Sequence, residues 1–155
     1  MPPVERLRRS LPALWAGVLL AIGGMAAPAA FALLARADAG RLVGRLFELE
    51  AWSGLALGAA LLLLERRHAL AQADAGTGSV FSTNLVLLMA ALFCTVAGYF
   101  ALLPMMDQAK SGQGALSFAM LHGISALLFV LKTSVVLLLA WRVQGQTSGC
   151  RATAA

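Results

Sequence analysis

Residues Ala115–Trp141, ALSFAMLHGISALLFVLKTSVVLLLAW, are the clearest indication of the fold class of this chain. It contains one basic residue, Lys132, and no acidic residue. A run of this length and polarity is typical of a transmembrane α-helix, because about 20 apolar residues are needed to cross the hydrocarbon core. No soluble domain of 155 residues needs so much apolar surface.

Three further apolar runs have the same character and span Leu11–Ala35, Leu46–Glu65 and Phe81–Leu103. The whole chain is 60% hydrophobic and only 12% charged, and its mean hydropathy is +0.82. We therefore expect an all-α integral membrane protein, folded as an antiparallel four-helix transmembrane bundle. Residues 1–155 form one membrane domain on this interpretation, with polar tails at 1–10 and 143–155.

Proline and glycine place the breaks between these runs. Pro28 interrupts the first run late, Pro104 is expected to end the third, and Ala71–Ser79, with Gly76 and Gly78, is expected to be a flexible loop. The first run resembles a signal peptide in its basic start. Its apolar part is longer than the roughly 7–15 residues of a signal core, so we expect it to be retained as a span.

Basic residues flank the apolar runs and predict the orientation of the chain. With the N-terminus inside, the cytoplasmic side holds seven Lys and Arg residues and the other side holds four. This bias favours a multi-pass protein of the bacterial inner (plasma) membrane with both ends in the cytoplasm. The arginines form no basic face on a soluble core, so we expect no nucleic-acid partner. The expected partners are the lipid bilayer and other membrane-protein subunits, or a second copy of the chain.

Polar side chains inside a span are costly and are therefore candidates for function. At about 100° per residue, one third of the last helix carries His122, Ser125, Phe129, Lys132 and Thr133, and we expect this face to point into the bundle. His122 is predicted to be hydrogen-bonded there, in the outer leaflet. The candidate polar cluster is His122, Ser125, Lys132, Glu50, Glu48, Arg45 and Tyr99.

Two interpretations of this cluster are open. It could bind a metal, relay protons or seat a polar head group, or it could only tie helices together through hydrogen bonds and an Arg45–Glu48 ion pair. We predict no catalytic residue, metal or cofactor. Haem ligation by two histidines would need another chain, since His68 is expected on the opposite side of the membrane. Cys94 and Cys150 are expected to be free thiols.

Lys132 is the most unusual of these residues, because it is expected near mid-membrane. No acidic residue is expected at the same depth. We therefore predict that its amine reaches backbone carbonyls, Thr or Asn acceptors, or water on the cytoplasmic side.

The segment Phe118–Ser125 contains the pattern histidine-glycine-x-serine at His122 to Ser125. Three further features accompany it in order along the chain: Pro28 with Phe31, Gly40 with Leu46-Phe47, and Pro104. Together they resemble the transmembrane protein 205-like family, which in bacteria is DUF4149, a domain of unknown function. The resemblance covers about Trp15 to Arg142 and implies a four-helix membrane protein without an assigned activity.

Three functions are therefore considered. The first is an accessory or structural subunit that packs against a larger membrane complex. The second is a carrier or channel for a small solute or metal ion, lined by His122, Ser125 and Lys132. The third, ranked last, is a membrane enzyme with a bound cofactor. A water-accessible path from His122 to Lys132 would favour transport, and a dry, close-packed interior would favour the structural role.

Overall fold

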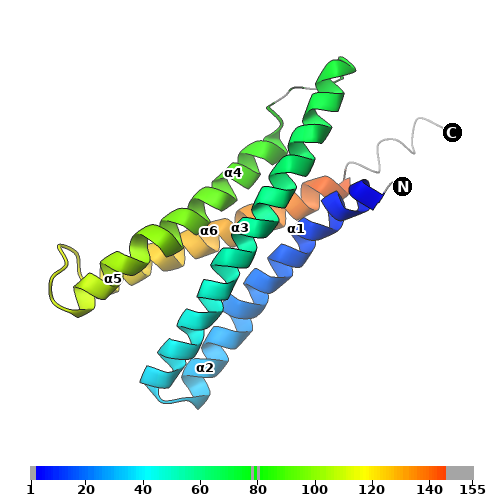
Figure 1. The fold of residues 1–155 in the computed structure, drawn as a ribbon. Coiled ribbons are helices and arrows are strands. Elements are labelled where there is room, and N and C mark those ends of the chain that lie inside the picture. The colour runs from blue at the N-terminus through cyan, green and yellow to red at the C-terminus, as the bar shows by residue number, and fades with distance from the viewer. Residues whose placement is uncertain (1–2, 78, 80, 146–155) are drawn as a thin grey trace.

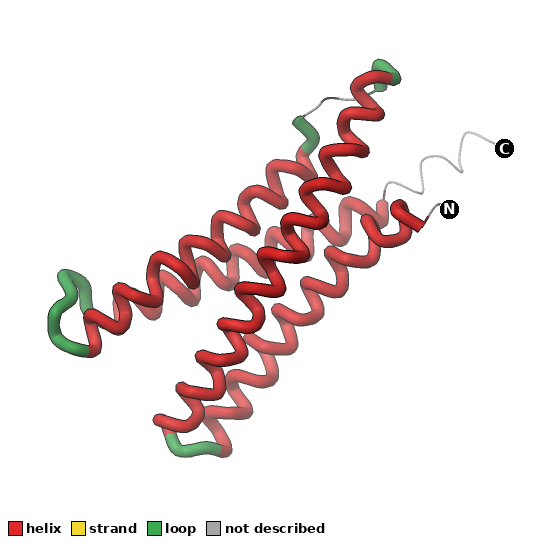
Figure 2. The backbone as a smooth tube through the Cα atoms, in the orientation of Figure 1, coloured by secondary structure: helices red, strands yellow, loops and turns green. Residues whose placement is uncertain are grey.

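The computed structural model describes residues 3–77, 79 and 81–145, and within them it contains helices and loops but no strand (Figure 2). The helices are, in chain order, α1 (Pro3–Ala21), the π-helix η1 (Ile22–Ala26), α2 (Ala27–Leu33), α3 (Arg36–Asp74), α4 (Thr83–Thr95), the π-helix η2 (Val96–Ala101), α5 (Leu102–Lys110) and α6 (Phe118–Gly145).

These elements make up four continuous helices that are long and apolar enough to cross a membrane: Pro3–Leu33, Arg36–Asp74, Thr83–Lys110 and Phe118–Gly145. They identify the chain as a multi-pass membrane protein, as its sequence predicted. Each of the four predicted spans falls largely within one of these helices. The helices are longer than the apolar runs because their polar first and last turns are helical too.

The chain forms two helical hairpins, one from α1 to α3 and one from α4 to α6 (Figure 1). Helix α1 packs against α3 and α6, and α4 packs against the same two helices. We call the end that holds Pro3, Gly145 and the loop 75–82 the terminal end. At the opposite end the loops 34–35 and 111–117 lie apart, so the two hairpins diverge there (Figure 1).

Two glycines with positive φ follow the ends of α3 and α5. Gly76 has a φ of 69° and Gly112 a φ of 76°, a backbone conformation that favours glycine. After α3, the amide of Thr77 donates to the carbonyl of Gln72, which closes the last turn. The predicted loop Ala71–Ser79 therefore began four residues too early, because α3 continues through Asp74 before Gly76 stops it.

Pro104 does not end the third helix, contrary to the sequence prediction. The π-helix η2 precedes it, and the amide of Leu102 donates to the carbonyl of Ala97, five residues back. The wider π-helical turn accommodates the proline, which lacks an amide N–H and whose ring clashes with the preceding turn of an α-helix. The helix therefore continues as α5. Pro28 follows η1 in the same way, with the amide of Ala27 donating to the carbonyl of Ile22.

The main core lies in the terminal half of the molecule and is shared by all four long helices. Its buried residues are Trp15, Ala16, Leu19, Leu61, Leu88, Ala91, Val136, Leu139 and Val143. A Cβ added at Gly58 would lie 2.4 Å from Leu92 Cδ2 and 3.5 Å from Trp15 Cη2, so this glycine makes room for the close packing of α3. The smaller second core, Ala30, Ala39 and Val43, joins only α2 and α3.

Candidate functional site: a buried ion pair between the hairpins

A carboxylate and an ammonium group meet in the interior between the two hairpins. Lys132 Nζ on α6 donates to Glu50 Oε2 on α3 at 2.6 Å. Glu50 is 3% exposed and Lys132 5% exposed, so the pair is almost completely shielded. The indole N–H of Trp15 on α1 points at the other carboxylate oxygen, at 3.4 Å. Three helices therefore contribute to one polar site.

This ion pair corrects the prediction that Lys132 has no acidic residue at its depth. Helix α3 begins at Arg36, well before its apolar run, and α6 begins at Phe118, three residues after the predicted start of its span at Ala115. Glu50 and Lys132 each lie fourteen residues after the first residue of their helix, or about 21 Å at 1.5 Å per residue. Both helices start at the same end of the molecule, so the two residues lie level. The sequence estimate placed Glu50 too close to the membrane surface.

Aromatic rings cover the pair toward the opposite end. Lys132 Nζ lies 5.4 Å from the centroid of the Phe129 ring, within the range of a cation–π contact. Phe129 meets Phe47 edge to face, with ring centroids 5.1 Å apart. Gly23 in η1 allows this arrangement, because a Cβ there would lie 2.5 Å from Phe129 Cε1.

Glycine on α3 also makes room beside the carboxylate. A Cβ at Gly54 would lie 3.0 Å from Glu50 Oε1 and 3.3 Å from Trp15 Nε1. A methyl group at this position would crowd both the indole and the carboxylate where they approach each other. Gly54 and Gly58, one turn apart, thus form the surface on which Trp15 packs.

The prediction for His122 was wrong. Its side chain is exposed and its ring stacks on that of Phe118, with centroids 5.9 Å apart and planes 13° apart. Among the described residues it has no hydrogen-bond partner. At about 100° per residue, Leu121 lies only about 20° from Lys132 around the helix and His122 about 80°. The buried face of α6 therefore passes through Leu121, which is 1% exposed.

The other predicted cluster members do not join the ion pair. Arg45 and Glu48 form their own salt bridge at 2.6 Å, and the arginine side chain is 63% exposed. Tyr99 is half-buried and its ring contacts Phe100 edge to face at 5.0 Å, while Ser125 is half-buried. Of the seven candidates, the structure joins Glu50 to Lys132 and Arg45 to Glu48, and no hydrogen bond or ion pair among the described residues links the two pairs.

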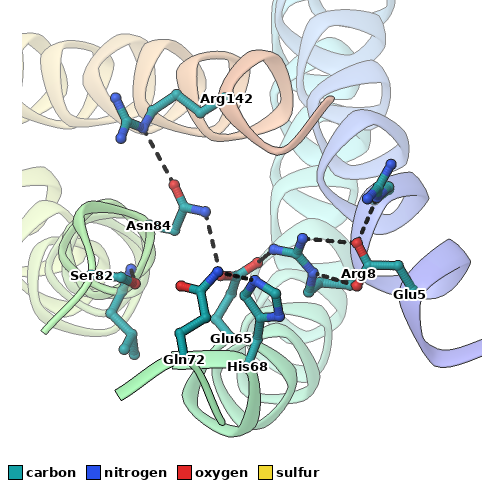
Figure 3. A network of polar contacts seen from close by, with 10 residues as sticks. Glu5, Arg8, Glu65, His68, Gln72, Ser82, Asn84 and Arg142 are labelled. Atoms are coloured by element: carbon teal, nitrogen blue, oxygen red, sulfur yellow. Dashed lines mark hydrogen bonds and ion pairs between the residues drawn. The ribbon is translucent and has the colours of Figure 1, made fainter. Parts of the chain in front are cut away.

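A second polar network, which the sequence did not reveal, closes the terminal end (Figure 3). Arg8 Nη1 on α1 donates to Glu65 Oε1 on α3 at 2.7 Å, and both side chains are buried. Asn84 Nδ2 on α4 donates to Glu65 Oε2 at 3.3 Å, and Arg142 Nε on α6 donates to Asn84 Oδ1 at 3.3 Å. Each of the four long helices supplies one member of this network.

Glu5 extends the network on the outside of α1. It accepts from Arg8 Nε at 3.0 Å and from Arg9 Nε at 2.6 Å. Arg8, which is buried, therefore lies between the carboxylates of Glu5 and Glu65 (Figure 3). The i, i+3 and i, i+4 spacing of Glu5 could have been recognised in the sequence. The contact of Arg8 with Glu65 spans 57 positions and leaves no local pattern.

The described residues offer few ligands for a metal. They contain no group of three or more His, Cys, Asp or Glu side chains that could hold an ion together. Cys94 is a buried free thiol, and Cys150 lies outside the described residues. Within the described part of the chain, every buried side-chain nitrogen and oxygen has a hydrogen-bond partner.

The family model of DUF4149, a domain of unknown function, matches residues 11–115. The chain belongs to the DUF4149 family. The matched residues include Trp15 and Glu50 of the ion-pair site and end before α6, which carries Lys132 and the His122 pattern. No curated protein and no solved structure matches this DUF4149 protein.

Proposed function

We propose that this DUF4149 protein inserts into the bacterial inner membrane as an antiparallel four-helix bundle with the terminal end in the cytoplasm. The distribution of basic residues supports this orientation. The terminal end holds Arg6, Arg8, Arg9, Arg66, Arg67 and Arg142, whereas the opposite end holds Arg36, Arg41, Arg45 and Lys110.

Within that membrane, the proposed role is that of an accessory or structural subunit. The observation that supports it most directly is the closed Glu50–Lys132 pair: each charge is neutralised inside the chain, and both side chains are shielded. In hydrocarbon, polar contacts of this kind hold helices together. The network at the terminal end does the same at a second level. The bundle is therefore built as a firm scaffold whose apolar outside is available to lipid and to neighbouring subunits.

A carrier lined by His122, Ser125 and Lys132 is less well supported. That proposal needs the three side chains on one accessible path, but His122 is exposed while Lys132 is buried and paired. The proposal of a cofactor-dependent enzyme has no supporting group of ligands among the described residues.

Purification in mild detergent from native membranes tests the proposed role. An affinity-tagged chain is expected to copurify with a larger membrane complex in fixed proportion. A Glu50→Gln/Lys132→Met variant serves as the matched control: it removes both charges while keeping similar volumes, so it should fold and retain the same partners. Isolation as a lone monomer that catalyses solute uptake in liposomes would contradict the proposal.

A further inference from the structure

The two hairpins have the same layout in their first helices. Each contains an α-helix, a π-helical segment and then a proline that continues into a short helix: α1, η1 and Pro28 in one, α4, η2 and Pro104 in the other. The two prolines are 76 positions apart in the sequence. The same displacement relates the buried positions of the two helices, in the pairs Arg8/Asn84, Pro12/Leu88, Trp15/Ala91 and Leu19/Thr95.

The second helices, α3 and α6, correspond with a displacement of 82 positions. The sequence Leu46-Phe47-Glu48-Leu49-Glu50 in α3 matches Leu128-Phe129-Val130-Leu131-Lys132 in α6 at both leucines and at the phenylalanine. The buried positions coincide as well, in the pairs Ala39/Leu121, Glu50/Lys132, Gly54/Val136, Gly58/Ala140 and Leu61/Val143.

Corresponding residues touch one another across the interface between the hairpins. Phe47 contacts Phe129, and Glu50 contacts Lys132. A residue meets its own counterpart only close to a two-fold axis, where a surface patch packs against a copy of itself. The helix contacts obey the same symmetry, since α1 packs on α3 as α4 packs on α6, and α1 packs on α6 as α4 packs on α3.

We infer that this chain is a tandem duplication of one two-helix unit, whose copies pack about a pseudo-two-fold axis between Phe47/Phe129 and Glu50/Lys132. The axis runs along the helices, so the repeats are parallel and not inverted. The opposite charges at Glu50 and Lys132 are the specificity determinant of this interface. A symmetric pairing of identical units would place two buried like charges together, whereas the unlike units neutralise each other.

The asymmetry of the site agrees with this assignment. Trp15 donates to Glu50, and the counterpart of Trp15 in the second unit is Ala91, which has no donor. The first unit thus carries a carboxylate with its own N–H donor. The second unit carries the cation.

Charge exchange in the full chain tests the inference. Glu50→Lys and Lys132→Glu each place two like charges side by side in the interior. Each variant is expected to give far less monodisperse monomer than the wild type in size-exclusion chromatography in detergent. The double exchange, Glu50→Lys/Lys132→Glu, is expected to restore a folded monomer, because equivalent positions accept either polarity. Recovery should be incomplete, since the relocated carboxylate lacks the Trp15 donor.

Coexpression of the two single variants under different tags provides the second arm. The Glu50 unit of the Lys132→Glu chain can then pair with the Lys132 unit of the Glu50→Lys chain, and the two exchanged units can pair with each other. A heterodimer carrying both tags is therefore expected, whereas either variant expressed alone should form no folded dimer. A double exchange as poorly folded as the single variants would overturn the equivalence of the two positions. Single variants that stay monomeric and folded would overturn the specificity role, as would failure of the coexpressed chains to associate.

Discussion

Glu50 and Lys132 are 82 positions apart in the chain, yet their side chains form a 2.6 Å ion pair in the interior. The contact joins the second helix of one hairpin to the second helix of the other. An unpaired ammonium at the centre of a bilayer is costly, on the order of 3 kcal/mol on insertion scales. The carboxylate of Glu50 removes the need for a partner protein or a water-filled path to Lys132.

The indole N–H of Trp15 is expected to contribute less to the stability of the fold than the charges of Glu50 and Lys132 do. Trp15→Phe keeps an aromatic ring at this position but removes the donor to Glu50 and part of a fully buried indole, so it is expected to lower the free energy of unfolding by about 1–3 kcal/mol. Unfolding in mixed SDS–detergent micelles measures this change. An unchanged midpoint would show that the 3.4 Å contact contributes nothing.

Two adjacent glycines in η1 offer a matched comparison. Gly23→Ala would place a methyl group 2.5 Å from Phe129 Cε1, whereas a methyl group at Gly24 would meet no neighbouring side chain within 4 Å. Because Phe129 is held against Phe47, Gly23→Ala is expected to destabilise the protein by about 1–3 kcal/mol. Gly24→Ala should be neutral. Equal melting temperatures for the two variants would contradict the packing of Phe129.

The polar network at the terminal end should contribute more to the stability of the fold than the exposed basic residues around it. Arg8→Met leaves the buried carboxylate of Glu65 without its charged partner and is expected to cost about 3 kcal/mol. Arg66→Met, at an exposed position of the same end, serves as the control and should change stability little. The same thermal unfolding assay compares both variants, and similar losses would argue against a structural network.

The orientation predicts which loops are accessible from outside the cell. In a background with Cys94→Ala and Cys150→Ser, a single cysteine at Gln113 should react with an impermeant thiol reagent in intact cells. A single cysteine at Ala75 should react only after the membrane is permeabilised, because the loop 75–82 is expected in the cytoplasm. The reverse pattern would place the terminal end outside.

Composition and periodicity predicted the helical class and the four membrane-length helices because these depend on long apolar runs alone. They did not predict which polar residues meet. Placing Glu50 level with Lys132 requires both helix starts, Arg36 in α3 and Phe118 in α6, and neither coincides with the start of its apolar run. The exposure of His122 depends on a rotation of about one residue around α6, which a periodicity argument does not resolve.

Proline was the other source of error. Pro104 is typical of a helix stop in a sequence, but the π-helical turn of η2 before it lets the helix continue. The Arg8–Glu65 contact and the correspondence between the hairpins likewise became visible only when residues distant in sequence were brought together.

The coupling free energy between Glu50 and Lys132 measures how far the buried ion pair holds the two hairpins together. It is obtained from a double-mutant cycle of Glu50→Gln, Lys132→Met and the double variant, with unfolding free energies measured in mixed micelles. Each single variant strands one buried charge and should lose about 3–5 kcal/mol, whereas the double variant should lie close to the wild type. We therefore predict a coupling of several kcal/mol between the two positions. Additive losses, with no coupling between the two positions, would contradict it.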